Sequence, residues 1–163
     1  MMPSGEKAVS LDKIDHMILK ALLEDGRISY SAIAKDTELT DVAIKKRVDS
    51  LKRKGVISNI SVKINYDVLG FQNPLYVQIR SDVSQTKDLI KKLNSLDYVV
   101  ELFTVLGEYN FLAKLILPNV SHAEVFITEL GNLSGVKDIK ALVVLKSLKD
   151  SPSLPTSTLQ KKL

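Results

Sequence analysis

The sequence contains no cysteine, and this absence excludes three kinds of chemistry. Without thiols a chain forms no disulfide bonds, holds no zinc through cysteine and uses no thiolate nucleophile. It also lacks a continuous apolar run of about 18 residues, the length needed to cross a bilayer as a helix. The first ten residues contain no apolar stretch typical of a secretion signal. These absences predict a cytoplasmic protein that does not bind membranes.

Motifs of common enzyme classes are missing as well. The sequence has no P-loop, no dinucleotide-binding glycine fingerprint and no G-x-S-x-G nucleophile elbow. Its two histidines, His16 and His122, stand far apart, and neither has a metal-ligating companion three or four residues further on. We therefore expect no catalytic residue, no metal and no cofactor. An enzyme or a metabolite-binding module is the less favoured alternative.

Positive charge is present, and it is concentrated in the first half of the chain. The net charge is +4, yet residues 1–66 hold 12 Lys and Arg against 9 Asp and Glu, whereas residues 67–150 hold 9 against 10. Residues 43–63 alone hold seven cations and a single anion, Asp49. Such a distribution favours a first half that binds a polyanion. A solvated helix face is the alternative.

Residues 11–58 predict a helix-turn-helix domain of three helices followed by a strand. The first helix covers residues 11–24 and ends at Asp25-Gly26, where glycine tolerates left-handed geometry. Ser10 or Asp12 caps the first helix, Ser29 or Ser31 the second and Thr40 the third, and Gly55 ends the third. Residues 56–66 alternate like a β-strand. Residues expected to face the core include Ile33, Ala34, Val42, Ile44, Val48 and Leu51.

The third helix is the candidate recognition helix, because a rigid helix with cations on one face reaches phosphates and major-groove base edges. Asp41, Val42, Lys45 and Lys46 are expected towards the bases, and Arg47 beside the backbone or a guanine. For Asp41, stabilisation of the helix dipole is an equal alternative to cytosine readout. The residues predicted at DNA are Thr40, Asp41, Val42, Lys45, Lys46, Arg47, Lys52 and Arg53, the last two at phosphates.

Residues 73–150 predict a ferredoxin-like domain of order βαββαβ, so that the whole chain is α+β. The predicted strands are residues 73–81, 98–106, 111–117 and 135–148, and the helices are residues 86–96 and 121–133. Two helices cover only one face of such a sheet. Apolar residues on both sides of the strands therefore predict self-association through this domain.

The turn Gly107-Glu108-Tyr109-Asn110 is the one polar, aromatic-bearing turn between two apolar strands. An ordinary hairpin turn explains it, because Gly107 and Asn110 accept permissive backbone geometry. The functional alternative is a loop that binds a small zwitterion through its backbone donors and Asn110. Both interpretations stay open at the level of the sequence.

Three segments together resemble the Lrp/AsnC (leucine-responsive, feast/famine) transcription regulators. They are LDKIDHMILKALLEDGRIS (11–29), IAKDTELTDVAIKKRVDSLKRKGVI (33–57) and LGEYNFLAKL (106–115). The resemblance covers residues 11 to about 148, with both domains in the family's order. It implies homodimers, often assembled to octamers, that bind pseudo-palindromic double-stranded DNA. Half-sites of a symmetric dimer lie about 10 bp apart.

The resemblance also implies an amino-acid effector between C-terminal domains of neighbouring dimers. The corresponding residues here are Tyr76, Thr104, Leu106, Gly107, Glu108, Tyr109, Asn110 and Ala141. The hypothesis from the whole sequence is therefore a sequence-specific, DNA-associated transcription regulator that responds to an amino acid. The alternative is an architectural, chromatin-like protein that wraps DNA with little sequence choice.

The chain departs from the family pattern at three places. Glu38 replaces the glycine of the helix-turn-helix corner, where a left-handed non-glycine residue costs about 1–2 kcal/mol, so a reshaped turn is expected. Asn110 replaces a common aspartate, and its carbonyl is expected to accept from an effector's ammonium group. Ala141 and Leu142 replace hydroxyl residues, which points to a different effector or none. Outside the domains we expect an extension over residues 1–10, a strand linker over 59–72 and a disordered tail over 151–163.

Overall fold

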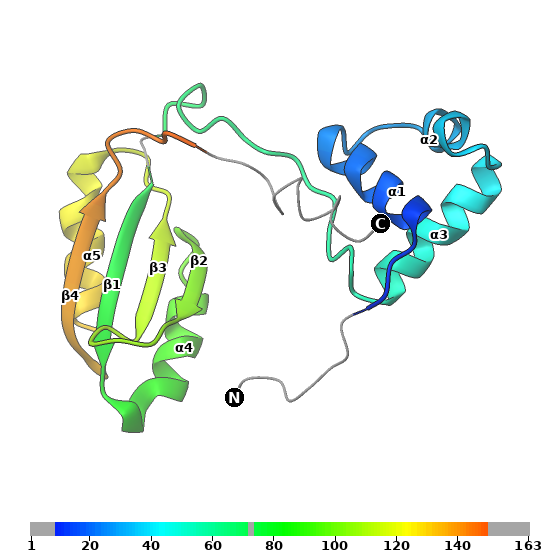
Figure 1. Cartoon of the computed structure of the whole chain (residues 1–163). Coiled ribbons are helices and arrows are strands. Elements are labelled where there is room, and N and C mark those ends of the chain that lie inside the picture. The colour runs from blue at the N-terminus through cyan, green and yellow to red at the C-terminus, as the bar shows by residue number, and fades with distance from the viewer. Residues whose placement is uncertain (1–8, 72–73, 150–163) are drawn as a thin grey trace. The chain divides into compact units, whose positions relative to one another are not determined.

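The computed structural model describes residues 9–71 and 74–149 (Figure 1). They form two compact units, and the boundary between the units in the sequence falls between Lys63 and Ile64. The expectations of an N-terminal extension over 1–10 and a disordered tail over 151–163 fall, apart from residues 9 and 10, outside the described residues. None of the described helices combines the length and apolar character that crossing a bilayer requires.

The first unit consists of three helices: α1 (Lys13–Glu24), α2 (Tyr30–Thr37) and α3 (Asp41–Arg53). A side chain caps each start, because Asp12, Ser29 and Thr40 each accept the backbone N–H three residues further on, at 2.8, 3.1 and 3.2 Å. The helices enclose a core whose buried members are Ile18, Ile33, Ala34, Ile44, Val48 and Leu51. The predicted three-helix domain is confirmed, with one error: Val42 is 63% exposed and not part of the core.

Two turns of this unit differ from expectation. Glu38 retains the left-handed corner between α2 and α3 with φ of 56°, so the corner is not reshaped despite its non-glycine residue. Gly26 does not need a left-handed conformation. It needs space, because a Cβ atom there would lie 3.2 Å from Cγ2 of Ile60. Gly55 does adopt positive φ, 71°, and ends α3 with the bonds Gly55 N–H to Lys52 and Val56 N–H to Leu51.

Residues 56–65 form no β-strand, and the predicted strand over this segment is wrong for the single chain. The alternation is real, and Ile60, Val62 and Ile64 are all exposed. A strand, however, is defined by hydrogen bonds to a neighbouring strand. No described segment of the chain pairs with it, so an alternating sequence is left without strand structure.

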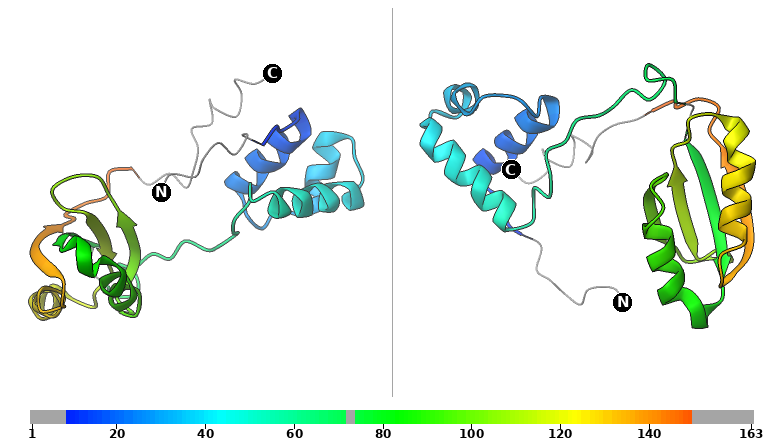
Figure 2. Two further views of the ribbon diagram at one scale, coloured as in Figure 1. Left: turned by 90° about the horizontal axis from the view of Figure 1, so that it is seen from below. Right: turned by 180° about the vertical axis from the view of Figure 1, so that it is seen from behind.

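The second unit carries a four-stranded antiparallel sheet of order β2-β3-β1-β4. Its strands are β1 (Leu75–Ser81), β2 (Val99–Thr104), β3 (Phe111–Leu115) and β4 (Val136–Val143). Its helices are α4 (Thr86–Asn94) and α5 (Ala123–Gly131), each preceded by a 3₁₀ turn, η1 (Val83–Gln85) and η2 (Val120–His122). The predicted ferredoxin-like order is confirmed, and both helices cover the same sheet face (Figure 2).

The two faces of this sheet differ in chemistry. The covered face forms the core, with buried Leu75, Val77, Ile79, Phe111, Ala113 and Leu115 from the strands and Leu89, Leu93 and Leu130 from the helices. The opposite face is mixed. Strand register places Phe103 opposite Leu112, and Tyr76 opposite Leu142, with an ion pair between Lys114 and Glu101 at 2.7 Å on the same face. Phe103 and Leu142 are 47% and 46% exposed.

Candidate nucleic-acid interface and effector loop

The solvent-facing side of α3 presents four of the predicted DNA-binding cations. Lys45, Lys46, Lys52 and Arg53 are all exposed, and none has a side-chain partner among the described residues. Like charges gathered on one side of a helix repel each other in the free protein. A polyanion relieves this repulsion, so this helix side is suited to a phosphate backbone.

Asp41, predicted near the bases, is bonded within the domain. It is the first residue of α3, and its Oδ2 accepts a short hydrogen bond from the Ser31 hydroxyl on α2. This bond ties the start of α3 to α2 across the helix-turn-helix corner. Asp41 also lies in the first turn of α3, where a negative charge is favoured by the helix dipole. The geometry supports the stabilising alternative for Asp41 rather than cytosine readout.

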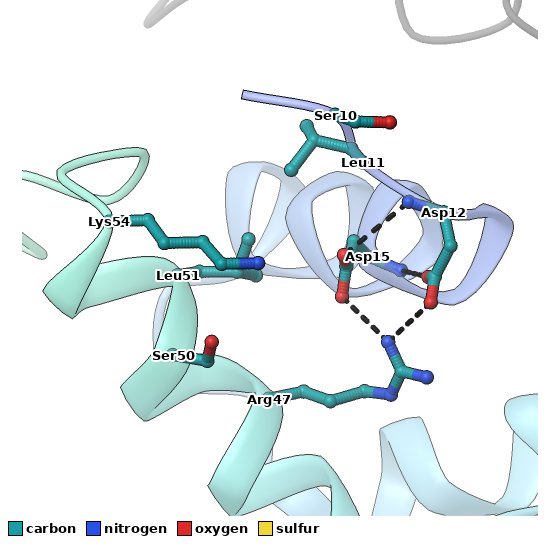
Figure 3. Close-up of a pocket in the computed structure, with 8 residues that line it drawn as sticks. All are labelled: Ser10, Leu11, Asp12, Asp15, Arg47, Ser50, Leu51 and Lys54. Carbon is teal, nitrogen blue, oxygen red and sulfur yellow. Dashed lines mark hydrogen bonds and ion pairs between the residues drawn. The ribbon is translucent and has the colours of Figure 1, made fainter. Parts of the chain in front are cut away.

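Arg47 lies between α3 and the start of α1 (Figure 3). Its Nη1 lies 2.6 Å from Oδ2 of Asp12 and 2.9 Å from Oδ1 of Asp15. The same two aspartates cap α1 reciprocally, because each side chain accepts the other's backbone N–H. The Asp15 side chain is only 11% exposed, so Arg47 neutralises a nearly buried charge. In the single chain the guanidinium of Arg47 holds α3 against α1, and its position beside the DNA backbone or a guanine stays a prediction.

Asp12 and Arg47 each favour the charged form of the other. The pKa of Asp12 is lowered, first by the Asp15 backbone N–H and then by Arg47. The pKa of Arg47 is raised above its ordinary value, chiefly by its hydrogen bond to Asp12. Both shifts favour the charged forms, the carboxylate of Asp12 and the guanidinium of Arg47.

The cluster borders a pocket of about 280 Å³ lined by Ser10, Leu11, Asp12, Asp15, Arg47, Ser50, Leu51 and Lys54 (Figure 3).

In the second unit the hairpin between β2 and β3 is tied to β1 through Asn110. The Asn110 Oδ1 accepts the backbone N–H of Ser81 at 2.8 Å, and its Nδ2 donates to the Ser81 hydroxyl at 2.8 Å. The backbone N–H of Asn110 donates to the carbonyl of Ile79. The amide of Asn110 is therefore engaged in structure, and its expected carbonyl contact with an effector would use the second lone pair of Oδ1, since the first accepts from Ser81.

The remaining polar side chains of the hairpin reach β4. The Tyr109 hydroxyl donates to Oδ2 of Asp138 at 2.7 Å, and this bond lowers the pKa of Asp138 and raises that of Tyr109. Arg80 lies 3.7 Å from Glu108 and 3.9 Å from Asp138 through its guanidinium nitrogens. The Lys140 ammonium lies 5.1 Å from the centre of the Tyr109 ring, within cation–π range.

The structure brings only part of the predicted effector set together. Glu108 lies beside Arg80, Tyr109 is bonded to Asp138, the second carboxylate near Arg80, and Asn110 is bonded to Ser81. Leu106, next to Gly107, projects into solvent and is 97% exposed. Strand register places Ala141 opposite Val77, and Thr104 opposite Phe111, on the helix-covered side of the sheet. Tyr76 pairs with Leu142 and so lies on the other side. Within one chain these residues do not form a single site.

Sequence reasoning missed several residues that organise these regions. Asp12 was predicted as a cap, and Asp15 was recognisable as its partner, because an acidic pair at i and i+3 before an apolar helix is a capping signal. Their bonds to Arg47 join residues that are 35 and 32 positions apart in the sequence, so no local sequence pattern predicts them. Arg80, Ser81, Asp138 and Lys140 likewise meet the hairpin only through strand pairing.

Comparison with known proteins gives these features a family. Residues 11–52 match the AsnC-type helix-turn-helix domain, and residues 75–154 match the Lrp/AsnC ligand binding domain. The chain is 30% identical over 146 residues to the HTH-type transcriptional regulator Ptr1 of Methanocaldococcus jannaschii, covering 89% of this chain and 99% of that protein. It is 28% identical over 147 residues to the HTH-type transcriptional regulator FL11 of Pyrococcus abyssi, covering 90% and 97%.

Solved structures share the fold along nearly their whole length. The crystal structure of PH0061 has a TM-score of 0.77 at 26% identity, covering 88% of this chain and 99% of that one. The Neisseria meningitidis transcriptional regulator NMB0573, solved as an L-Met complex, has a TM-score of 0.85 at 22% identity, covering 92% and 99%. At that identity the second likeness concerns the fold alone.

A DNA-binding helix-turn-helix unit followed in one chain by a ferredoxin-like ligand-binding unit defines a class of transcription regulators that are not enzymes. Within that class, the chain belongs to the Lrp/AsnC family.

Proposed function

We propose that this regulator binds specific DNA sequences through α3 as a homo-oligomer, and that an amino acid or related metabolite modulates it. The observation that carries the first part is the set of exposed cations Lys45, Lys46, Lys52 and Arg53 on the second helix of the helix-turn-helix. The alternative of an architectural DNA-wrapping protein has no support in the comparisons, since the relatives are named transcriptional regulators.

The experiment is a binding titration of the full chain against the promoter of its own gene and against random duplex, at several salt concentrations. Specific affinity exceeding random affinity by about 10³-fold or more supports the proposal. Lys45→Ala and Lys46→Ala should each lower the salt slope by about 0.9 for every phosphate that the lysine neutralises. Lys91→Ala on α4 is the charge-matched control and should leave the slope unchanged. Equal affinity for both duplexes would refute sequence-specific binding.

The second part of the proposal concerns the hairpin at Gly107–Asn110. It is supported by the match of its domain to a ligand-binding domain and by the charges gathered around it. Arg80 and Lys140 offer cations to a carboxylate, and Glu108 and Asp138 offer carboxylates to an ammonium group. A bound amino acid can therefore replace the ion pairs within this cluster, because its carboxylate pairs with the cations and its ammonium group pairs with the carboxylates.

Because the predicted effector residues do not converge within one chain, we propose that neighbouring copies complete the site. The test is thermal unfolding of the full chain with each amino acid at millimolar concentration, together with the molar mass from light scattering. A ligand present at 100 times its Kd stabilises the native state by about 2.7 kcal/mol. No change in melting temperature or mass with any amino acid would contradict the effector proposal and leave the DNA-binding proposal standing.

A further inference from the structure

Val42 stands apart from every other large apolar residue of α3. Ile44, Val48 and Leu51 are at most 1% exposed, whereas Val42 is 63% exposed and does not pack against the core of its unit. A β-branched residue is a poorer helix former than alanine, so helix stability gives no reason for valine at this surface position. Neither the core nor the helix explains this side chain.

The position of Val42 is that of a base-reading residue. It is the second residue of α3, directly after the cap Thr40 and the first residue Asp41. Residues at the N-terminal end of a recognition helix are the ones that contact base edges. Lys45 and Lys46 follow at i+3 and i+4, so they lie on the same face of the helix as Val42.

Two polar side chains near Val42 already have partners within the domain, and Val42 is the exposed large apolar residue at this end of the helix. Asp41 is bonded to Ser31, and Arg47 is bonded to Asp12 and Asp15. Lys45 and Lys46 are flexible point charges suited to phosphates, which position a protein without reading sequence. Val42 is therefore available for an apolar contact with a base at this end of α3.

We propose that Val42 is a specificity-determining residue that packs against the C5-methyl group of a thymine in the major groove. That methyl group is the apolar feature among the hydrogen-bonding edges of the groove, and apolar side chains recognise it. The inference rests on the proposed function, since it presupposes specific binding through α3. It adds the base that is read and the residue that reads it.

The test begins with selection of a preferred site from a random duplex library by the full-length protein. Each thymine of that site is then replaced in turn by deoxyuridine, which lacks only the C5-methyl group. At one thymine position per half-site, the replacement should lower the affinity of the protein for the duplex about fourfold, which is the effect of one buried methyl-sized group. With Val42→Ala the thymine and deoxyuridine duplexes should bind equally at that position, while other positions keep their wild-type ratios.

Leu23→Ala is the matched control, because Leu23 is an exposed apolar residue of α1, 37% exposed, outside the core cluster. It should retain the wild-type thymine-to-deoxyuridine ratio. Val42→Thr, which keeps one methyl group and the branched shape, provides a second measurement should Val42→Ala bind too weakly. It should show a ratio between those of wild type and Val42→Ala.

Three results would overturn the inference. A site without a deoxyuridine-sensitive thymine would do so, as would an unchanged ratio in both Val42 variants. A changed molar mass of the Val42 variants with an unchanged ratio would make Val42 an assembly contact instead. These outcomes leave the proposed function intact, because specific binding is still observed. Failure to select any preferred site would refute the proposed function itself.

Discussion

Arg47 carries both the strongest sequence signal for DNA contact and the clearest structural reason against it. Its side chain is 33% exposed and is shared between two carboxylates of α1. The guanidinium of Arg47, which belongs to α3, therefore holds α3 in place against α1. It adds no positive charge to the DNA-facing surface, since the bridge as a whole carries one negative charge more than positive.

Arg47→Ala should destabilise the first unit by about 1–3 kcal/mol, because Asp15 is left nearly buried without its partner. Arg47→Lys should recover part of this loss, since one ammonium group cannot reproduce the planar bridge. Urea unfolding of the three proteins measures the difference. The dependence of DNA affinity on salt concentration should be the same in Arg47→Lys as in wild type. If this dependence is weaker in Arg47→Ala but unchanged in Arg47→Lys, Arg47 contacts a DNA phosphate after all.

Asp82 provides a pH-dependent prediction in the second unit. Its carboxylate accepts the Ser84 backbone N–H at 3.0 Å and lies 3.0 Å from Nζ of Lys137. These contacts, that of Ser84 first, lower its pKa from 3.8 to about 2. Because the folded pKa lies below the unfolded one, the stabilisation is present above pH 3.8 and is lost as the pH falls through about 2.

Asp82→Asn should therefore melt at a lower temperature than wild type at pH 6, and this difference should shrink towards pH 2. Asp97→Asn, at an exposed position without a side-chain partner among the described residues, serves as the control. Melting curves followed by circular dichroism between pH 2 and pH 7 test the prediction. A difference that is constant over this range would show that the charge of Asp82 does not matter.

At the scale of elements, the corner between α2 and α3 retains left-handed geometry although its residue is not glycine. Glu38 adopts φ of 56° and ψ of 30°, and the next residue, Leu39, donates its backbone N–H to the carbonyl of Ala34. A Cβ atom in this region costs about 1–2 kcal/mol. The packing of α3 against α2 outweighs this local cost.

Glu38→Gly should accordingly stabilise the first unit by about 0.5–1 kcal/mol, the relief of strain less the greater freedom of glycine in the unfolded chain. Glu38→Ala keeps the Cβ atom and removes the carboxylate, so it should bring no such gain. Denaturant midpoints of the two variants measure the effect. An equal gain in both would assign it to the charge of Glu38 instead of its backbone.

Helices and strands inside each unit followed their local patterns, because caps and periodic apolar residues are encoded within a few positions. Thr40 and Ile44 illustrate this, one as a cap and the other as a core residue of α3. The linker did not follow its pattern. Its alternating residues 56–65 lack a neighbouring strand, and strand structure depends on a neighbour that the segment itself does not contain.

At the scale of the whole molecule, the mixed open face of the sheet is a candidate surface for self-association. Phe103 and Leu142 are exposed there, with Leu112 and Tyr76 beside them. Isolated exposed apolar residues are ordinary on a protein surface, but two apolar cross-strand pairs on one uncovered sheet face favour contact with another molecule. A second copy presents the same two pairs and is the partner we expect.

Phe103→Asp should weaken assembly by about 2 kcal/mol or more, because the aromatic ring no longer packs at the interface and a charge must be desolvated. Light scattering over a range of protein concentrations measures the change. Val83→Asp is the control, since Val83 is 85% exposed in η1 and lies outside the sheet. An unchanged molar mass in Phe103→Asp would place self-association on another surface.

The sequence by itself determined the helix-turn-helix, the βαββαβ order, the cores and the family, because these follow from periodicity, capping and short motifs. Tertiary structure alone decided which partners the candidate site residues have. Arg47 and Asp41 are bonded within the domain, Asn110 holds Ser81, and Val42 is left facing solvent. The physical reason is that a side chain's partner is set by which residues the fold brings within about 3 Å. Sequence spacing carries little information about pairs that lie some thirty residues apart.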